Sequence, residues 1–394
     1  LTRLNLIFTA DNHIEIQQTH VVSIEDCEFT SNVASTLPML KLALDAAQVT
    51  LNGVKFHDAN RNAMISVLTG QTKLTLDTVE FSNLMAADST SNYWDVTDSS
   101  VTITSSIMTK APGFVMTLNS STLSIFDTSI TENKRLANGG AMYLTCTNST
   151  IVIQGSIFTD NAATNGTKTN IGGVGMVFLV DSDLTVTNST FDRNEVTNGS
   201  GAALFNSVNG SSRIFFQDCR FINSFAGYSG IVYTLVTSPV PTDIAFDRCM
   251  FSGNTIVESS GSLYVEGNRT SLNVTNCVFD NNVADFASAI RYIGSDGYVG
   301  LFNSTITNGW QRLKGAVVIE LKHGDTGVAE VVGCLFRNHS GQQHPEDGGG
   351  IGVAQMAALS IDSESGKTKS ITIESSFFYT NIGGTAGASR ISVI

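Results

Sequence analysis

The stretch Ile244-Ala-Phe-Asp-Arg-Cys-Met-Phe-Ser-Gly-Asn254 decides the fold of this chain, because about thirteen variants of it follow one another. Their shared pattern is apolar, any, apolar, any, any, small, any, Phe, any, any, Asn. Apolar residues two apart are typical of a half-buried strand, and the two polar residues between the pairs indicate a corner. Each copy therefore predicts a short strand, a corner, a second short strand and a corner marked by Asn.

The copies recur at a spacing that is typical of stacked repeats. They begin near Val22, Val49, Leu74, Val101, Leu123, Ile151, Leu184, Ile214, Ile244, Leu272, Val299, Ala329 and Ile371, on average about 29 residues apart. Between them lie Gly-rich turns followed by apolar strands, for example Gly139-Gly-Ala-Met-Tyr-Leu144 and Gly261-Ser-Leu-Tyr-Val265. We therefore expect about three strands per coil, and a rod about 60 Å long at roughly 4.8 Å per coil.

Two slots of the repeat predict internal ladders. Phe or another apolar residue fills the first slot: Phe29, Phe56, Phe81, Met108, Ile130, Phe158, Phe191, Phe221, Phe251, Phe279, Ile306, Phe336 and Phe378. Asn fills the second at Asn32, Asn133, Asn161, Asn194, Asn254, Asn282 and Asn381, with Asn60 one residue late. An inward Asn at a corner can bond its own turn and the Asn residues above and below it.

Phe-x-x-Asn followed by Gly-Gly-Ala-apolar, as in Phe158-Thr-Asp-Asn161 and Gly139-Gly-Ala-Met142, resembles the repeats of the polymorphic outer-membrane-protein type. These repeats belong to the wider right-handed β-helix (pectin-lyase-like) superfamily. The resemblance implies an all-β, right-handed parallel β-helix (solenoid) of about 13 coils with internal Phe and Asn ladders. We expect one such domain over residues 1–394, either by itself or as a segment of a longer chain. It also implies a surface-exposed or secreted protein, with adhesive, structural and polysaccharide-cleaving relatives.

Charge and hydropathy exclude several classes of partner. The net charge is −13 and the pI is about 4.8, which argues against nucleic acid and anionic membranes. No apolar run reaches the roughly 18 residues that span a bilayer, so we expect no membrane span. We expect no cofactor and no metal.

Five of the six cysteines share the small slot before the Phe: Cys27, Cys219, Cys249, Cys277 and Cys334, with Cys146 on a different strand. The pattern predicts buried thiols. At most one disulfide could form within Cys219, Cys249 and Cys277, which lie in consecutive coils.

About ten Asn-x-Ser/Thr sequons are candidate sites for N-linked glycans: Asn119, Asn148, Asn165, Asn188, Asn198, Asn209, Asn268, Asn273, Asn303 and Asn338. Roughly seven would arise by chance in a chain so rich in Ser and Thr. At Asn188 and Asn303 the sequon also overlaps the repeat pattern.

An enzyme of this superfamily would need clustered carboxylates, and the Asp pairs, Gly-His-Gly string and basic triplet of its hydrolases are absent. Isolated candidates are Asp181 with Asp183, Asp280 with Asp285, and the segment containing His339, His344, Glu346 and Asp347, which we interpret as a solvated loop. Glycan binding without catalysis would need exposed aromatic rings, for which Tyr93-Trp94 and Trp310 are the candidates, although either could equally cover the core. We predict no catalytic residue.

The sequence favours a non-enzymatic structural glycoprotein of the cell surface or an extracellular filament, which self-associates through the ends of its β-helix. One alternative is an adhesin or glycan-binding β-helix, whose saturable binding would be lost on substitution of Trp94 or Trp310. A second alternative is a polysaccharide lyase or hydrolase, which product formation on acidic polysaccharides would reveal.

Overall fold

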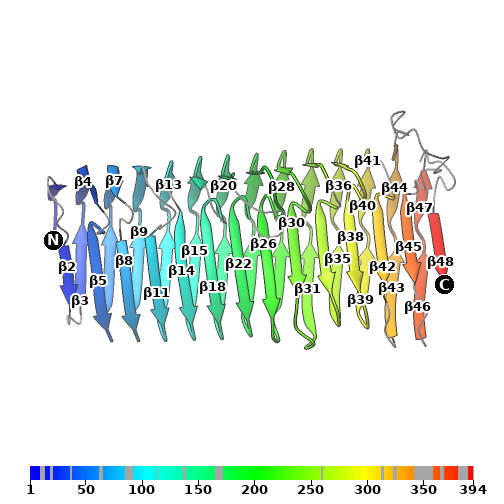
Figure 1. Ribbon diagram of the computed structural model, residues 1–394, viewed down its shortest axis with the longest axis horizontal. Coiled ribbons are helices and arrows are strands. Elements are labelled where there is room, and N and C mark those ends of the chain that lie inside the picture. The colour runs from blue at the N-terminus through cyan, green and yellow to red at the C-terminus, as the bar shows by residue number, and fades with distance from the viewer. Residues whose placement is uncertain are drawn as a thin grey trace.

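The computed structural model describes residues 1–8, 14–17, 21–35, 38–61, 65–84, 92–111, 113–135, 139–164, 172–258, 261–311, 315–322, 326–340, 358–363, 368–379 and 389–393. In this part of the chain the backbone winds into a stack of coils along one axis, with the two termini at opposite ends (Figure 1). Strands of successive coils pair in parallel to form sheets of 14, 14, 13 and 7 strands. The all-β parallel solenoid predicted from the repeats is confirmed.

Each repeat motif supplies one strand to sheet A, followed by one strand to sheet B. Sheet A consists of β3 (Val21–Glu25), β6 (Gln48–Asn52), β9 (Lys73–Asp77), β12 (Ser100–Thr104), β15 (Thr122–Phe126), β19 (Thr150–Gln154), β23 (Asp183–Thr187), β27 (Arg213–Gln217), β31 (Thr242–Asp247), β35 (Thr270–Thr275), β39 (Tyr298–Phe302), β43 (Thr326–Val332) and β46 (Thr368–Glu374). Sheet B consists of β1 (Asn5–Phe8), β4 (Glu28–Ser35), β7 (Lys55–Arg61), β10 (Glu80–Leu84), β13 (Ile107–Thr109), β16 (Ser129–Thr131), β20 (Ile157–Thr159), β24 (Thr190–Asp192), β28 (Arg220–Ile222), β32 (Met250–Ser252), β36 (Val278–Asp280), β40 (Thr305–Thr307), β44 (Leu335–Arg337) and β47 (Phe377–Tyr379).

The Gly-rich half of each repeat supplies sheet C, and a short sheet D lies between sheets B and C along the chain. Sheet C consists of β2 (Ile14–Gln17), β5 (Leu40–Asp45), β8 (Ile65–Gly70), β11 (Asn92–Thr97), β14 (Phe114–Asn119), β18 (Met142–Thr147), β22 (Gly175–Val180), β26 (Leu204–Asn209), β30 (Val232–Val236), β34 (Leu263–Gly267), β38 (Ile290–Gly294), β42 (Val317–Leu321), β45 (Leu359–Ser363) and β48 (Ser389–Val393). Sheet D consists of β17 (Lys134–Arg135), β21 (Ala162–Ala163), β25 (Glu195–Val196), β29 (Phe225–Ala226), β33 (Thr255–Ile256), β37 (Val283–Ala284) and β41 (Trp310–Gln311).

The corner between sheets A and B passes through a left-handed residue. In the quoted stretch this residue is Arg248, with φ of 52°, and the buried Cys249 follows it. The amide of Arg248 donates to the carbonyl oxygen of Thr275 in the next coil at 3.0 Å. A left-handed conformation costs a non-glycine residue roughly 1–2 kcal/mol, and this hydrogen bond between coils offsets part of that cost.

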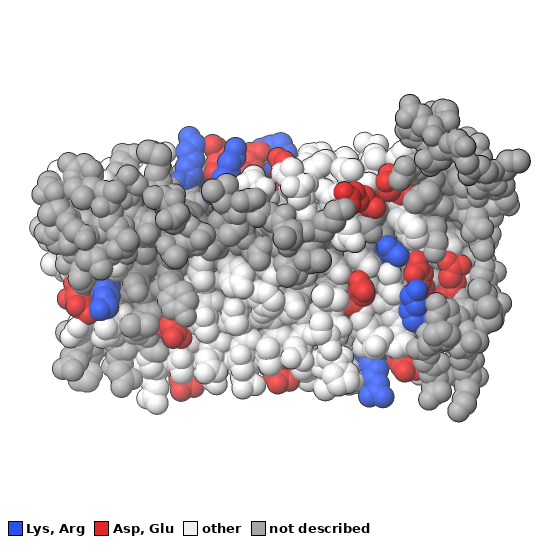
Figure 2. All heavy atoms as spheres, in the orientation of Figure 1, with Lys and Arg blue, Asp and Glu red and all other residues white. Residues whose placement is uncertain are grey.

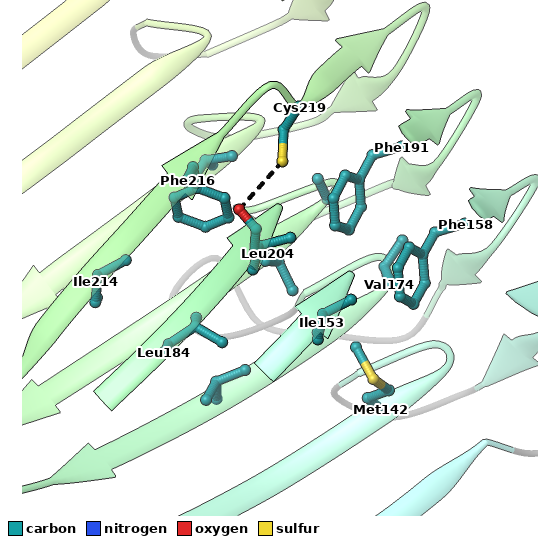
Figure 3. Close-up of a cluster of buried hydrophobic side chains, with 14 of the residues drawn as sticks. Met142, Ile153, Phe158, Val174, Leu184, Phe191, Leu204, Ile214, Phe216 and Cys219 are labelled. Atoms are coloured by element: carbon teal, nitrogen blue, oxygen red, sulfur yellow. Dashed lines mark hydrogen bonds between the residues drawn. The ribbon is translucent and has the colours of Figure 1, made fainter. Parts of the chain in front are cut away.

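The predicted Phe ladder is confirmed. Phe251 is fully buried, and its ring centroid lies 4.6 Å from that of Phe221 and 4.8 Å from that of Phe279. Figure 3 shows the same arrangement for Phe158 and Phe191, whose near-parallel rings are 4.7 Å apart. Such offset stacks add to the gain from apolar burial.

The Asn ladder is confirmed at the described positions of its slot. The side-chain amide of Asn161 donates to the carbonyl of Ile130 at 2.8 Å and to Oδ1 of Asn194 at 3.1 Å. Its own Oδ1 accepts from the backbone and side-chain amides of Asn133, at 3.1 and 2.9 Å. Asn254 and Asn282 repeat this pattern. Three further predicted members fall outside the described side chains, namely Asn32, Asn60 and Asn381.

The cysteines are buried free thiols, as the repeat pattern predicts. Cys219 donates through Sγ to the carbonyl oxygen of Val186 at 3.4 Å (Figure 3). Burial raises the pKa of the Cys146 thiol to about 12. Cys219, Cys249 and Cys277 form no disulfide in this structure.

Replacing Phe251 with Ala should lower the free energy of unfolding by about 3–5 kcal/mol, because it leaves a cavity inside the ring stack. Phe377, which is 67% exposed, is the matched control, and Phe377→Ala should cost less than about 1 kcal/mol. Urea denaturation followed by circular dichroism measures both. Equal losses in the two variants would contradict the position of the ladder.

Replacing Asn161 with Ala should cost about 2–4 kcal/mol, because two buried amide donors of Asn133 lose their acceptor. Asn198→Ala, at an exposed position, should change stability by less than about 0.5 kcal/mol. The same denaturation experiment compares the two. If Asn161→Ala hardly changes the free energy of unfolding, water must replace the hydrogen bonds of the ladder at no cost in stability.

Candidate functional site

The candidate glycosylation sites are mostly at the surface. Eight of the ten Asn side chains are exposed: Asn119, Asn148, Asn188, Asn198, Asn209, Asn268, Asn303 and Asn338. Asn273 is half-buried, and Asn165 lies outside the described residues. Exposure permits a glycan at these positions and does not test whether one is attached.

Four of the exposed sequon residues have a structural reason to be Asn. Asn148, Asn188, Asn303 and Asn338 all have positive φ, between 46° and 57°. Asn tolerates the left-handed region better than most residues, because its side chain bonds locally. Asn338 also donates from Nδ2 to Oδ1 of Asn308 in the preceding coil at 3.1 Å.

Trp94 is not an exposed aromatic platform, and that part of the glycan-binding prediction is wrong. Its side chain is 0% exposed and packs edge-on against Phe114, with ring centroids 5.4 Å apart. The large ring fills the interior of the β-helix behind sheet C. Trp310 in β41 is half-buried, and the side chain of Tyr93 lies outside the described residues.

Three of the acidic candidates accept hydrogen bonds from residues of the next coil. Oδ1 of Asp181 accepts from the amide of Ser211 at 2.9 Å, and Oδ1 of Asp183 accepts from the amide of Arg213 at 3.0 Å. Oδ1 of Asp280 accepts from the side chains of Thr307 and Asn308, at 2.8 Å each. Asp285 is half-buried. These bonds account for the positions of the first three carboxylates without invoking catalysis.

His339 is buried, contrary to its interpretation as part of a solvated loop. It occupies the slot that Asn fills in other coils, is 1% exposed, and its Nε2 lies 2.9 Å from the carbonyl oxygen of Ile306. The slot holds Gly309 in the preceding coil, and a Cβ there would lie 2.8 Å from Nδ1 of His339. Burial lowers the pKa of His339 to about 4. His344, Glu346 and Asp347 lie outside the described residues.

The outer face of sheet C carries an aromatic row that the sequence analysis did not predict. Met176, Phe205, Tyr233 and Tyr264 lie side by side in consecutive strands and form an apolar cluster separate from the core. The rings of Tyr233 and Tyr264 stack with centroids 4.6 Å apart. The signal was present, since each residue occupies the same outward position after a Gly-rich turn.

Charged side chains continue this row toward the C-terminus. Glu266 Oε2 accepts from the hydroxyls of Tyr233 and Tyr264, at 3.1 and 2.8 Å. The guanidinium of Arg291 follows Tyr264 in register and lies 5.3 Å from its ring centroid. Figure 2 shows acidic and basic side chains close together over the C-terminal part of the viewed face, and few charges over its described middle.

Partners within this network engage both of its carboxylates. Glu320 is 8% exposed, and its carboxylate lies 3.4 Å from Arg291 Nη2 and 3.6 Å from Lys322 Nζ. Burial, followed by the neighbouring Glu266, raises the pKa of Tyr233, which keeps its hydroxyl protonated as a donor. Both carboxylates are therefore held by partners, so the network clamps four coils together and presents no free base.

An open cleft of about 590 Å³ lies where successive coils enter sheet A. It is lined by Pro241, Arg269, Thr270, Ser271, Asp296, Gly297, Tyr298, Thr326 and Val328. Tyr298 donates from its hydroxyl to Glu330 Oε2 at 2.8 Å, and burial followed by this bond raises its pKa to about 12. Asp296 Oδ1 accepts from the amide of Thr326 at 2.7 Å. The sequence does not indicate this cleft, because its residues come from four coils.

No metal-binding group was found among the described residues, where no three His, Cys, Asp or Glu side chains converge. This part of the chain also holds no helix that is long and apolar enough to cross a membrane.

Comparison with known families matches residues 40–221 to a family model described as right-handed β-helix region. The chain contains a right-handed β-helix. The match covers somewhat less than half of the 394 residues, and the same sheets continue beyond it on both sides. Both findings are consistent with the pectin-lyase-like superfamily. A comparison with curated proteins found no match.

As the pH is lowered from about 6.5 to about 4, protonation of His339 should lower the free energy of unfolding of this β-helix. Its pKa is lower in the folded than in the unfolded chain, so the unfolded chain binds more protons in this window. The full loss would be roughly 3 kcal/mol. His339→Asn should remove this part of the pH dependence in urea denaturation measured from pH 7 to pH 4. The carboxylates act equally in both proteins, so identical pH slopes would contradict the assignment.

Proposed function

We propose that this chain is a non-enzymatic structural glycoprotein of the cell surface or of an extracellular filament. Its β-helix serves as a rigid rod, and rods join end to end through their strand edges. The observation that carries the proposal is the in-register stacking of identical slots through the described coils. A rod of this kind needs no closed site, and each coil is stabilised by its neighbours.

The strands at both ends of the described stack support the assembly step. Within the described residues, β1 and β2 pair on one side only, as do β46, β47 and β48, while the outer side of β3 has a single bridge, between Glu25 and Thr2. The free edge of a strand is a template for another strand, which further coils of the same protein or a second copy would supply. Ile371 and Ile373, inward residues of β46, are only partly buried and offer an apolar surface for the next coil.

The ionisable groups support the absence of catalysis. Asp181, Asp183 and Asp280 bind the next coil, and the carboxylates of Glu266 and Glu320 are held by Tyr, Arg and Lys side chains. Glycoside cleavage needs one carboxyl group as an acid and a second as a base or nucleophile. The exposed sequons support the glycoprotein part of the proposal.

Electron microscopy of the purified chain tests the assembly step, and we expect filaments with a subunit repeat. Ile373→Lys should abolish them, because joining would bury an unpaired charge in the core. Thr372→Lys, its neighbour on the outer face of β46, adds the same charge outside the core and should leave filaments intact. Dispersed single rods at high concentration would contradict the assembly step. Product formation from an acidic polysaccharide, with or without Ca²⁺, would contradict the non-enzymatic part.

A further inference from the structure

Asn273 differs from the other described sequon residues, because it lies in the middle of a strand. It faces outward from β35, is half-buried, and stands in register between Ala245 in the preceding coil and Gly300 in the next. Both neighbours are small. The small Ala245 leaves room beside the Asn273 amide on the outer face of sheet A.

Two aromatic rings lie over Gly300. A Cβ at this glycine would lie 2.3 Å from Cε2 of Phe302 and 2.8 Å from the hydroxyl oxygen of Tyr298. Both residues are half-buried, and the glycine that they cover is the register neighbour of Asn273. Aromatic residues that cover a glycine strengthen a strand, and this accounts for the rings alone.

The cleft described above begins at the same place. Asn273 Nδ2 donates to Ser271 Oγ at 3.3 Å, and Ser271 and Tyr298 both line the cleft. The cleft also presents Arg269, Asp296 and Thr326. Its volume of about 590 Å³ lies within the range of small-ligand sites. An aromatic ring beside charged and hydroxyl groups suits a sugar, which has an apolar face and a rim of hydroxyls.

We propose that Asn273 carries an N-linked glycan whose first sugars lie in this cleft against Tyr298. The inference rests on the glycoprotein part of the proposed function. In the attachment step, Nδ2 of Asn273 bonds to the anomeric carbon of an oligosaccharide donor linked to a lipid diphosphate. The bond from that carbon to the diphosphate oxygen breaks, the lipid diphosphate leaves, and the amide proton passes to a base of the transferring enzyme.

The occupant of the cleft is thus part of the protein itself. A tethered sugar has a high effective concentration at the cleft, so even weak contacts hold it in place. The glycan would cover the half-buried rings of Tyr298 and Phe302 and extend over successive strands of sheet A. Asn148 is exposed at a corner and is not among the residues that line this cleft.

Secretion of the chain from a eukaryotic host, followed by peptide mass spectrometry and native endoglycosidase digestion, tests this. Asn273 should be occupied, and its glycan should be trimmed about tenfold or more slowly than that of Asn148, as expected if it leaves the cleft about a tenth of the time. Tyr298→Ala should abolish the protection. Tyr298→Phe, which keeps the ring and loses only the bond to Glu330, should retain it.

The outcomes separate this inference from the proposed function. If exposed sequons are occupied and Asn273 is not, or if the Asn273 and Asn148 glycans are trimmed equally fast, the inference is wrong and the glycoprotein proposal stands. If no sequon is occupied, both fail. If the Asn273 glycan is still trimmed slowly in Tyr298→Ala, the proposed contact between the first sugars and the Tyr298 ring is wrong.

Discussion

The structure depends on the backbone hydrogen bonds between successive coils. These bonds continue through the corners, where the amides of left-handed residues such as Arg248 and Asn276 donate to the coil that follows. Each coil must therefore keep nearly the same outline as its neighbours. Side chains of one type recur in each slot because a larger or smaller one would break the register of several sheets at once.

The interior tolerates polar groups only where they extend a continuous network. In the Asn slot, Ser224 replaces Asn and still connects the ladder, since its hydroxyl accepts from the amide of Asn194 and its amide donates to Asn254. Further along, Gly309 leaves space that the larger His339 uses. The slot thus selects for hydrogen-bonding capacity and size together, and the identity of each member depends on its neighbours.

The sequence was sufficient for features that repeat at one position. Phe251, Asn161 and Cys249 were placed correctly, because period-two alternation and regular spacing fix which side faces the core. The sequence did not decide between core and surface for Trp94, since aromatic rings serve both cores and binding surfaces and composition does not distinguish them. The row containing Tyr264 and the cleft beside Tyr298 were missed. Both arise from side chains about 30 residues apart that only the three-dimensional register brings together.

Breaks in the Phe ladder give the rod an internal segmentation. Stacked rings join Phe29 to Phe81, Phe158 to Phe279 and Phe336 to Phe378. Between these three stacks the slot holds Met108 and Ile130, and then Ile306. In a one-dimensional stack, stability passes only between adjacent units, so weaker junctions set the boundaries of cooperative melting. A pulling force along the axis would therefore unfold the coils in blocks. The rod could lengthen by unfolding one block while the other blocks stay folded.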